Sequence, residues 1–362
     1  MLNALLSGDY PRSRILAVAL ALIFIGLLAA PFLFPSVNAL NVAGKICVFI
    51  LLVASYDLLL GYTGIVSFAH TMFFGIGAYG VAIGLTRWGA DWVGVALGGV
   101  TALVISVALA ALIGLFSLRV RAIFYAMITL AVASAFAILA SQLSGFTGGE
   151  DGLTYRVPEI LRPAFRLFDG TILGVTFSGR VVAYYIAFIV CLALFLLLLR
   201  VVNSPFGRVL LAIRENQFRA EAIGYRTVHY RTAANCLSAA VATIAGMLLA
   251  LLLRYTNPDT TLSFAIMMDI LLMVVIGGMG TLYGSVAGTT IFLLAQVYLK
   301  DLMAAASKAT EGIPLLPNLL HPDRWLLWLG LLFIASVYFF PTGIVGKLRG
   351  MALGPGASRH GK

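Results

Sequence analysis

Charged side chains are scarce in this chain. Lys, Arg, Asp and Glu make up only 10% of its 362 residues, whereas hydrophobic residues make up 61%. This composition excludes a soluble fold, because too few polar side chains are present to cover the surface of a protein of this length. We therefore predict an all-α polytopic membrane protein.

Acidic residues are the scarcer charged type, with 14 Asp and Glu against 24 Lys and Arg, so the formal net charge is +10. In a soluble chain this excess of cations would indicate nucleic-acid binding. Here the cations cluster in short loops and tails between apolar runs, where they set the orientation of a membrane protein. We expect no nucleic-acid partner.

Cysteine is also rare. Cys47, Cys191 and Cys236 lie inside apolar segments, which is typical of small buried side chains and not of disulfides or metal ligands. The nucleotide-binding pattern G-x-x-x-x-G-K-[ST] does not occur, so any use of ATP must come from a separate subunit. We expect no metal and no cofactor in this chain.

Long apolar runs are abundant. A membrane-spanning helix needs about 20 apolar residues, and ten segments qualify: 15–34, 41–60, 62–86, 92–116, 122–143, 181–202, 233–253, 262–278, 281–299 and 324–341. We expect eight to ten spans. An even number places both termini on one side, and Arg12, Arg14 and Lys347 indicate the cytoplasm. The prediction is one transmembrane domain, residues 1–345, with a mobile tail, residues 346–362.

Glycine interrupts three of these segments, 62–86, 262–278 and 281–299. Small residues spaced four apart, as in Gly80 and Gly84, favour close helix packing. The alternative is a pair of broken helices in the two halves of the chain, which is typical of transporters. The candidate pathway residues are Asp57, Gly61, Gly64, Ser67, His70, Asp269, Gly277, Gly278 and Gly280.

Asp57 and Asp269 precede the two glycine-rich stretches. A carboxylate inside a membrane span normally faces a partner or a water-filled cavity, so each is a candidate site. For Asp57, a position near the headgroups or a hydrogen bond to a neighbouring helix is the alternative. His70 is expected to hydrogen-bond between helices, as a lone membrane histidine commonly does.

The one long charged segment is 203–231. Ser204 and Pro205 are typical of a helix start and Gly224 of a helix end, so the sequence predicts a single amphipathic helix between them. Its apolar face is predicted to contain Phe206, Val209, Leu210, Ile213 and Phe218. Six arginines in the segment indicate the cytoplasmic side. The helix either rests on anionic lipid or binds a soluble partner.

Residues 145–179 form the one long loop predicted on the outer side. The stretch GFTGGEDGLTYRVPEI is rich in turn-forming residues and mixed charge, which indicates an ordered loop. Such a loop either caps the outer end, binds a soluble partner or connects two spans. A second outer loop is predicted over residues 301–323.

Four stretches together resemble one family. They are GYTGIVSFAHTMFFGIGAY at 61–79, TGGEDGL at 147–153, SPFGRVLLAIRENQFRAEAIG at 204–224 and LLMVVIGGMGTLYGSVAG at 271–288. In this order they resemble the LivH/LivM-type permeases of ABC importers for branched-chain amino acids, and LivM-type permeases more closely. The same family includes permeases for urea, short amides and other amino acids.

The resemblance implies a bacterial inner-membrane complex. Its expected members are two ATPase subunits that bind ATP and Mg²⁺, a second, LivH-like permease and an extracytoplasmic binding protein. The charged helix would then be the coupling helix that docks on an ATPase, through Ser204, Phe206, Gly207, Arg208, Arg214, Glu215, Asn216, Arg219, Glu221 and Gly224. The outer loop would contact the binding protein through Thr147, Glu150 and Asp151.

Two other hypotheses remain at this point. A proton-coupled secondary transporter would use Asp57 or Asp269, with His70 as a proton relay. An intramembrane enzyme would use Ser67 as the nucleophile and His70 as the base, although the sequence offers no acid to orient the histidine.

Overall fold

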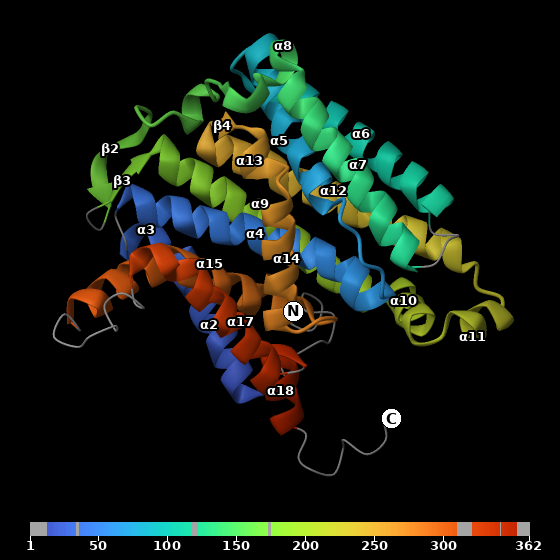
Figure 1. Ribbon diagram of the computed structural model, residues 1–362. Helices are drawn as coiled ribbons and strands as arrows, with labels where there is room; N and C mark the ends of the chain where they lie inside the picture. The colour runs from blue at the N-terminus through green and yellow to red at the C-terminus, as the bar shows by residue number, and fades with distance from the viewer. Residues whose placement is uncertain are drawn as a thin grey trace.

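The computed structural model describes residues 13–33, 36–117, 122–172, 175–309, 321–340 and 342–352 (Figure 1). The longer helices are α2 (Arg14–Leu28), α4 (Val37–Thr63), α5 (His70–Arg87), α6 (Trp92–Ser117), α7 (Ala122–Gln142), α9 (Gly179–Val202), α12 (Thr227–Leu253), α14 (Phe264–Gly277), α15 (Leu282–Ala309) and α17 (Trp325–Phe339). The shorter ones are α3 (Ala30–Leu33), α8 (Ser144–Thr147), α10 (Pro205–Glu215), α11 (Gln217–Ala222), α13 (Pro258–Thr261) and α18 (Gly343–Ala352). The fold is all-α, as the composition predicts.

Two small antiparallel sheets accompany the helices. β1 (Leu153–Thr154) pairs with β4 (Tyr255–Thr256), and β2 (Arg166–Ile172) pairs with β3 (Val175–Ser178). Three 3₁₀ turns, η1 (Gly149–Asp151), η2 (Glu159–Leu161) and η3 (Pro322–Arg324), complete the described elements. The predicted outer loop 145–179 is thus built from short ordered elements over its described residues.

Within the described part of the chain, seven helical stretches are long and apolar enough to cross a membrane. They are Val37–Thr63, Trp92–Phe116, Ile123–Gln142, Gly179–Val202, Thr227–Leu253, Pro258–Gly277 and Leu282–Lys308. The predicted count of about ten is therefore not confirmed. One reason is the predicted segment 62–86, which is no continuous helix: α4 runs on to Thr63 and α5 begins only at His70. Gly64, in the left-handed conformation with φ +71°, ends α4.

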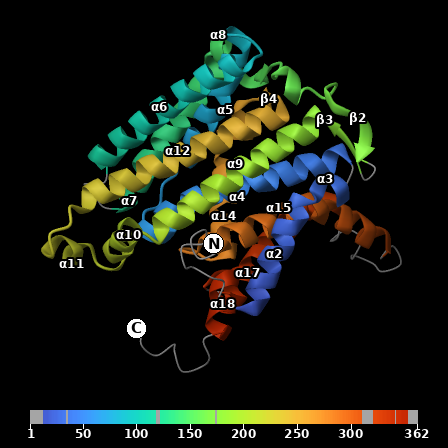
Figure 2. The same cartoon turned by 180° about the vertical axis from the view of Figure 1, so that it is seen from behind.

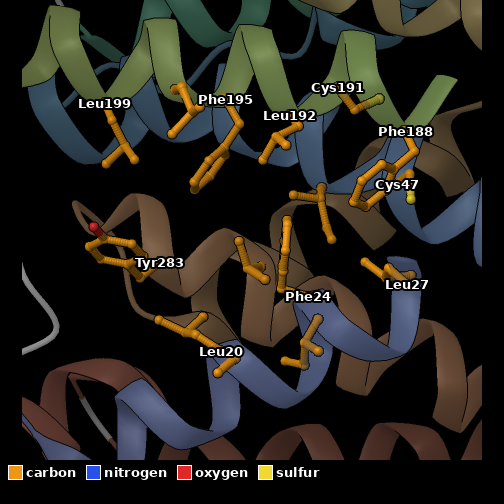
Figure 3. Close-up of a pocket in the computed structure, with 15 residues that line it drawn as sticks. Leu20, Phe24, Leu27, Cys47, Phe188, Cys191, Leu192, Phe195, Leu199 and Tyr283 are labelled. Atoms are coloured by element: carbon orange, nitrogen blue, oxygen red, sulfur yellow. The ribbon is translucent and has the colours of Figure 1, made fainter. Parts of the chain in front are cut away.

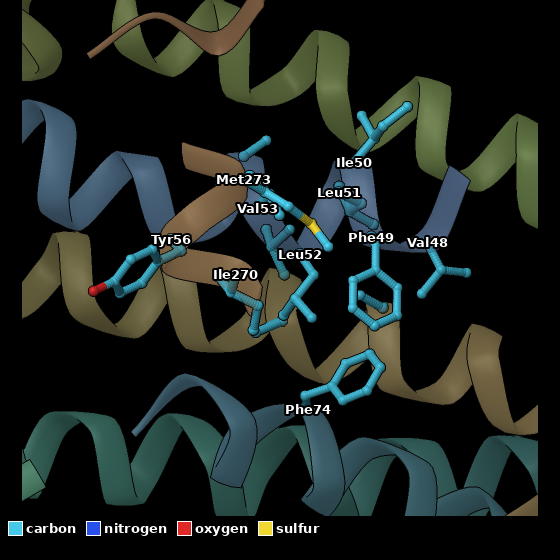
Figure 4. Close-up of a cluster of buried hydrophobic side chains, with 14 of the residues drawn as sticks. Val48, Phe49, Ile50, Leu51, Leu52, Val53, Tyr56, Phe74, Ile270 and Met273 are labelled. Atoms are coloured by element: carbon cyan, nitrogen blue, oxygen red, sulfur yellow. The ribbon is translucent and has the colours of Figure 1, made fainter. Parts of the chain in front are cut away.

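Helix α4 is the centre of the bundle. Almost every side chain from Ala43 to Thr63 is buried, around the whole circumference of the helix. Phe49 meets Phe74 of α5 edge to face at 6.0 Å, and Ile270 and Met273 of α14 lie beside it (Figure 4). Between Ala43 and Thr63 only Lys45 and Asp57 of α4 are charged, and a helix that is mostly apolar around its circumference belongs in the interior, so its sequence favours this central place.

The bundle has two distinct ends. Helices α10 and α11 lie at one end of α12, and α8 and β4 lie at the other (Figures 1 and 2). We call these the α10–α11 end and the α8–β4 end. Because α4 ends against α10, the first glycine-rich stretch starts at the α10–α11 end.

Many glycines lie where two helix backbones touch. A Cβ on Gly77 would lie 2.0 Å from the carbonyl oxygen of Thr243, and one on Gly246 would lie 1.9 Å from that of Phe74. A Cβ on Gly84 would lie 2.4 Å from the carbonyl oxygen of Gly94. Close packing is therefore the role of these glycines, which bring α5 against α12 and α6.

The predicted single helix over 204–224 is wrong. Asn216 has an extended backbone, with φ −157° and ψ 100°, so α10 ends at Glu215 and α11 starts at Gln217. The change of direction leaves Phe218 84% exposed instead of on the buried face. Helix α12 also starts at Thr227, before the predicted span 233–253.

Other boundaries also differ. Helix α15 continues to Ala309, so the predicted span 281–299 ends too early. Helix α18 includes residues 346–352 of the predicted tail, while residues 353–362 lie outside the described part of the chain. Arg12, used in the orientation argument, also lies outside the described residues.

We predict that Gly246→Ala destabilises the protein because the added Cβ would strike the carbonyl oxygen of Phe74. Overpacking of this kind costs about 1–3 kcal/mol. The matched control is Gly26→Ala in α2, where no heavy atom lies within 4 Å of the added Cβ. Thermal unfolding of the purified protein should show a lower midpoint for Gly246→Ala alone. Equal midpoints would contradict the proposed close contact of α5 and α12.

Candidate functional site

The first part of the site is a buried carboxylate at the α10–α11 end. Asp57, near the end of α4, has no exposed surface. Its Oδ1 accepts a hydrogen bond from the backbone N–H of Gly280 at 2.8 Å. Gly280 lies in the turn between α14 and α15, where φ is +115° at Gly278 and +80° at Gly280. The two glycine-rich stretches of the sequence therefore meet at Asp57.

Arg214 of α10 reaches the same place. Its guanidinium donates a hydrogen bond to the carbonyl oxygen of Gly61, in the last turns of α4. The positive charge of Arg214 also attracts the carboxylate of Asp57. A buried carboxylate needs such compensation, because an unpaired charge in the interior is costly.

Only glycine fits at two of these positions. A Cβ on Gly61 would lie 2.2 Å from Asp57 Oδ1 and 2.3 Å from the backbone nitrogen of Gly280. Gly280 has a φ of +80°, a left-handed backbone conformation in which any other residue would be strained. We call Asp57, Gly61, Arg214 and Gly280 the inner junction. It brings together residues that the sequence assigned separately to the pathway and to the coupling helix.

His70 lies elsewhere and joins three helices. Its Nε2 is 2.8 Å from the hydroxyl of Ser238 in α12, and that hydroxyl donates its one proton to the carbonyl oxygen of Ser55 in α4. His70 Nε2 is therefore the donor to Ser238. The ring also meets Tyr56 edge to face at 4.9 Å. His70 is an interhelical hydrogen-bonder, as predicted.

Ser67 and His70 do not form a nucleophile–base pair. Its hydroxyl accepts a hydrogen bond from the backbone N–H of Ala69 at 3.3 Å. His70 instead uses Nε2 for Ser238. Between these two described residues there is no hydrogen bond from the hydroxyl to the imidazole, which an activated serine requires.

Asp269 forms a second polar group, separate from the inner junction. Its Oδ2 accepts a hydrogen bond from Gln296 Nε2 of α15 at 3.5 Å, and the charge of Lys45 in α4 attracts it. Neither Lys45 nor Gln296 was among the site residues predicted from the sequence. The sequence does contain a signal for Lys45, because a cation inside the predicted span 41–60 is a candidate functional residue.

The start of the charged segment is held firmly to the bundle. The hydroxyl of Ser204 donates to the carbonyl oxygen of Val201 at 2.6 Å and accepts from the N–H of Gly207. A Cβ on Gly207 would lie 1.9 Å from the carbonyl oxygen of Val202. Phe206 stacks on Tyr230 with ring centroids 5.8 Å apart. Helix α10 is thus packed against α9 and α12.

Helix α11 is held by its own polar network. Asn216 caps it, accepting the N–H of Arg219 at 2.9 Å. The Glu221 carboxylate accepts from the hydroxyl of Thr227 at 2.6 Å and from Gln217 Nε2 at 2.9 Å. These hydrogen bonds, the one from Thr227 first, lower the pKa of Glu221 from its ordinary value. Glu221 therefore anchors α11 to the start of α12.

The outward surface of α10 and α11 combines charge with apolar side chains. Phe218 is 84% exposed and Ile223 is 68% exposed, and Arg208 and Arg219 of the same segment are exposed as well. Gly224, with φ +97°, turns the chain back toward α12. Exposed aromatic and aliphatic side chains next to arginines are typical of a protein-docking surface.

The predicted outer residues lie at the α8–β4 end. Thr147 is buried, and its hydroxyl donates to the carbonyl oxygen of Ala140 at 2.5 Å, so it supports the turn. Glu150 and Asp151 follow in η1 and are exposed. The hydroxyl of Tyr255 donates to the carbonyl oxygen of Asp151 at 2.8 Å, which fixes the turn to β4.

An apolar cavity of about 530 Å³, separate from the inner junction, borders α4 (Figure 3). It is lined by α2, α4, α9 and α15, with Phe24, Phe188, Phe195 and Tyr283 among its side chains. None of the predicted site residues lines it. Within the described residues, no group of three or more His, Cys, Asp or Glu side chains could hold a metal ion.

Sequence comparison identifies the family. A family model described as "Branched-chain amino acid transport system / permease component" matches residues 38–337. The chain belongs to this family. Members are membrane permease components and not enzymes, so the intramembrane-enzyme hypothesis is wrong, in agreement with the positions of Ser67 and His70.

Curated relatives carry the LivM name. The chain is 24% identical to the high-affinity branched-chain amino acid transport system permease protein LivM of Salmonella typhimurium, over 89% of this chain and 76% of that protein. It is 25% identical to the Escherichia coli protein of the same name, with the same coverage. A probable LivM of Methanocaldococcus jannaschii is 28% identical over 68% of this chain and 69% of that protein. Comparison with solved structures found no significant match.

We predict that Ser238→Ala destabilises the bundle, because it leaves His70 Nε2 buried without a partner. Such a loss costs about 1–3 kcal/mol. The control is Thr290→Ala, which removes a hydroxyl that donates to Val286 within its own helix. Chemical or thermal unfolding in detergent should separate the two variants. An unchanged midpoint for Ser238→Ala would contradict the assigned role of His70.

Proposed function

We propose that this chain is the LivM-like permease subunit of an ATP-driven, binding-protein-dependent importer for branched-chain or related apolar amino acids. The observation that carries the proposal is Arg214, which extends from the charged segment to Gly61 and lies beside Gly280. It links a surface suited to a soluble partner with the bends of the glycine-rich stretches. The family and the LivM relatives support the same function.

The proposed complex contains two ATPase subunits, which bind ATP and Mg²⁺, and a second, LivH-like permease. It lies in the bacterial inner membrane, with both termini and the α10–α11 end in the cytoplasm. The ATPase-coupling residues are Ser204, Phe206, Gly207, Arg208, Arg214, Glu215, Asn216, Arg219, Glu221 and Gly224. In this proposal the exposed Arg208, Phe218 and Arg219 meet the partner. Ser204, Gly207 and Glu221, whose contacts lie within the chain, hold the two helices in place.

The inner junction transmits the movement of the ATPases. When α10 moves, the Arg214 guanidinium moves with it. Separation of this positive charge from the buried Asp57 carboxylate would be costly. The end of α4 and the α14–α15 turn therefore follow. The backbone bends at Gly64, Gly278 and Gly280 are the places where the chain changes direction, so they serve as hinges.

At the α8–β4 end, the extracytoplasmic binding protein delivers the substrate. Glu150 and Asp151 offer exposed carboxylates on a turn that Thr147 and Tyr255 hold rigid. A rigid charged turn favours specific docking, because little conformational entropy is lost on binding.

We predict that two variants separate docking from transmission. Phe218→Ser together with Arg219→Glu should reduce co-purification of the ATPase subunits with the tagged chain, because it removes the exposed apolar and cationic contacts. Arg214→Ala should leave the ATPases bound but lower ATP-driven uptake about ten-fold or more, because transmission through the inner junction is lost. The control, Arg324→Ala in η3, should change neither readout.

Two outcomes would contradict the proposal. If the native chain purifies without ATPase subunits and moves solute on a proton gradient, the protein is a secondary transporter. The same conclusion follows if uptake does not depend on ATP hydrolysis and Asp57→Asn abolishes it. An importer should retain part of its uptake with Asp57→Asn, since the amide oxygen still accepts the Gly280 N–H.

A further inference from the structure

The apolar cavity of Figure 3 lies between α2 and α9 and is also lined by α4 and α15. Apart from Cys47, Cys191 and Tyr283, its lining residues are Leu, Ile, Val, Ala and Phe, and no charged residue is among those described. A buried water needs two to four polar partners, so this lining suits an apolar occupant. We call the cavity the α2–α9 wedge.

The two helices meet at one end of the wedge and separate toward the other. In the last turn of α2, the carbonyl oxygen of Leu28 accepts a hydrogen bond from the hydroxyl of Tyr185, near the start of α9, at 3.1 Å. The end of one helix thus meets the beginning of the other, and they run antiparallel. Leu20 and Leu199 lie at the wide end (Figure 3).

The wedge reaches a surface that is itself apolar. Phe24, which lines it, is exposed, and so are Leu22 and Ile189 on the outer faces of α2 and α9. Helix α9 is long and apolar enough to cross a membrane. Large exposed apolar side chains on such a helix face hydrocarbon, so the space between α2 and α9 is continuous with the lipid around the protein.

The length and level of the wedge match one leaflet of a bilayer. Its lining on α9 runs from Phe188 to Leu199, which is about 16 Å at 1.5 Å per residue. Half of the hydrocarbon core is about 15 Å thick. Because α9 is Gly179–Val202, the wedge occupies mainly the half of this helix that leads to the α10–α11 end.

A cation stands at the wide end. Arg200 follows Leu199 in the last turn of α9 and comes one turn after Leu196, which also lines the wedge. Arg200 is exposed, and within the described residues its guanidinium has no hydrogen-bond or ion-pair partner. At the end of an apolar span, such a side chain extends to the level of the lipid head groups. Its planar fork matches two oxygens of a phosphate.

We propose that the α2–α9 wedge binds one acyl chain of an anionic phospholipid from the leaflet at the α10–α11 end, with the lipid phosphate on Arg200. The chain lies against the apolar lining and reaches Cys47 and Ile50 of the central helix α4. It fills the space between α2 and the bundle at the end where the two helices separate. The site does not depend on which solute the protein moves.

A helix of a second subunit is the competing occupant. With its side chains a helix is about 10 Å wide, whereas the rings of Phe24 and Phe188 approach to 5.8 Å between centroids where the wedge narrows. A thin, flexible acyl chain can follow this taper to the closed end. The dimensions therefore favour lipid.

The first test uses the protein as purified from its membrane, with the subunits that accompany it, in nanodiscs of phosphatidylcholine. Phosphatidylglycerol with a photoreactive group in its acyl chain is added, and labelled residues are located by mass spectrometry. Labelling of wedge residues should saturate as the probe fraction rises and should fall when unlabelled phosphatidylglycerol competes. Labelling of Leu22 and Ile189 should rise in proportion to the probe, because lipid on the outer faces exchanges freely.

Two results of this test would overturn the proposal. Wedge labelling that rises without saturation would mean that the lipid there is no different from the lipid around the protein. Wedge labelling that is seen for the isolated chain but is absent from the purified assembly would mean that another subunit covers the wedge.

The second test examines the phosphate contact. Arg200→Ala should raise the half-saturating fraction of phosphatidylglycerol about ten-fold, because a charge-assisted hydrogen bond is lost. Arg200→Lys should raise it less, since the charge remains while the fork is lost. The matched control, Arg226→Ala, removes another exposed arginine at the α10–α11 end and should leave it unchanged. Equal effects of Arg200→Ala and Arg226→Ala would show general attraction to anionic lipid and overturn the site.

The third test fills the wedge. Leu192→Trp places a larger side chain in its lining and should abolish saturable labelling, whereas Ile189→Trp on the outer face of the same helix should not. Phosphatidylglycerol should raise the thermal unfolding midpoint of the wild type and of Ile189→Trp but not of Leu192→Trp, because a ligand stabilises only a protein that binds it. Unchanged saturation in Leu192→Trp would contradict the proposal. If Leu192→Trp fails to fold, wild-type saturation and the Arg200 variants still decide.

Discussion

The arrangement of this permease depends on one buried charge, the carboxylate of Asp57. It lies where α4 ends, the α14–α15 turn begins and α10 approaches: the turn donates the Gly280 N–H to it, and Arg214 of α10 attracts it while donating to the carbonyl oxygen of Gly61. Removal of any one contact would leave polar groups unpaired in the interior, which is costly. The buried carboxylate and its neighbours therefore join the charged segment to the end of α4, which is why we propose coupling through this point.

Backbone contact through glycine is the second constraint. Helices α5, α6 and α12 approach so closely that no Cβ fits at Gly77, Gly84 or Gly246, which makes this part of the bundle a rigid unit. Elsewhere glycine serves a different purpose: Gly64 and Gly280 have positive φ and mark bends. The same residue type thus stiffens one region and permits a change of direction in another.

Polar groups in the spans form two levels with different chemistry. Asp57 at the inner junction is fully buried, with one carboxylate oxygen hydrogen-bonded to Gly280, whereas Lys45, Asp269 and Gln296 are partly exposed. Loss of a neighbour is therefore costly for Asp57, whereas the partly exposed groups keep contact with their surroundings.

The sequence by itself determined the class of protein, most of the long helices, the interhelical role of His70 and the family, because these depend on composition, apolar run length and local motifs. It predicted one helix over 204–224, and the tertiary structure decided otherwise at Asn216, since packing of α10 and capping of α11 outweigh weak local propensity. Only the tertiary structure could bring Arg214 to Gly61 and Lys45 to Asp269. Those residues are far apart in the chain, and no local pattern encodes which distant helix a buried charge will meet.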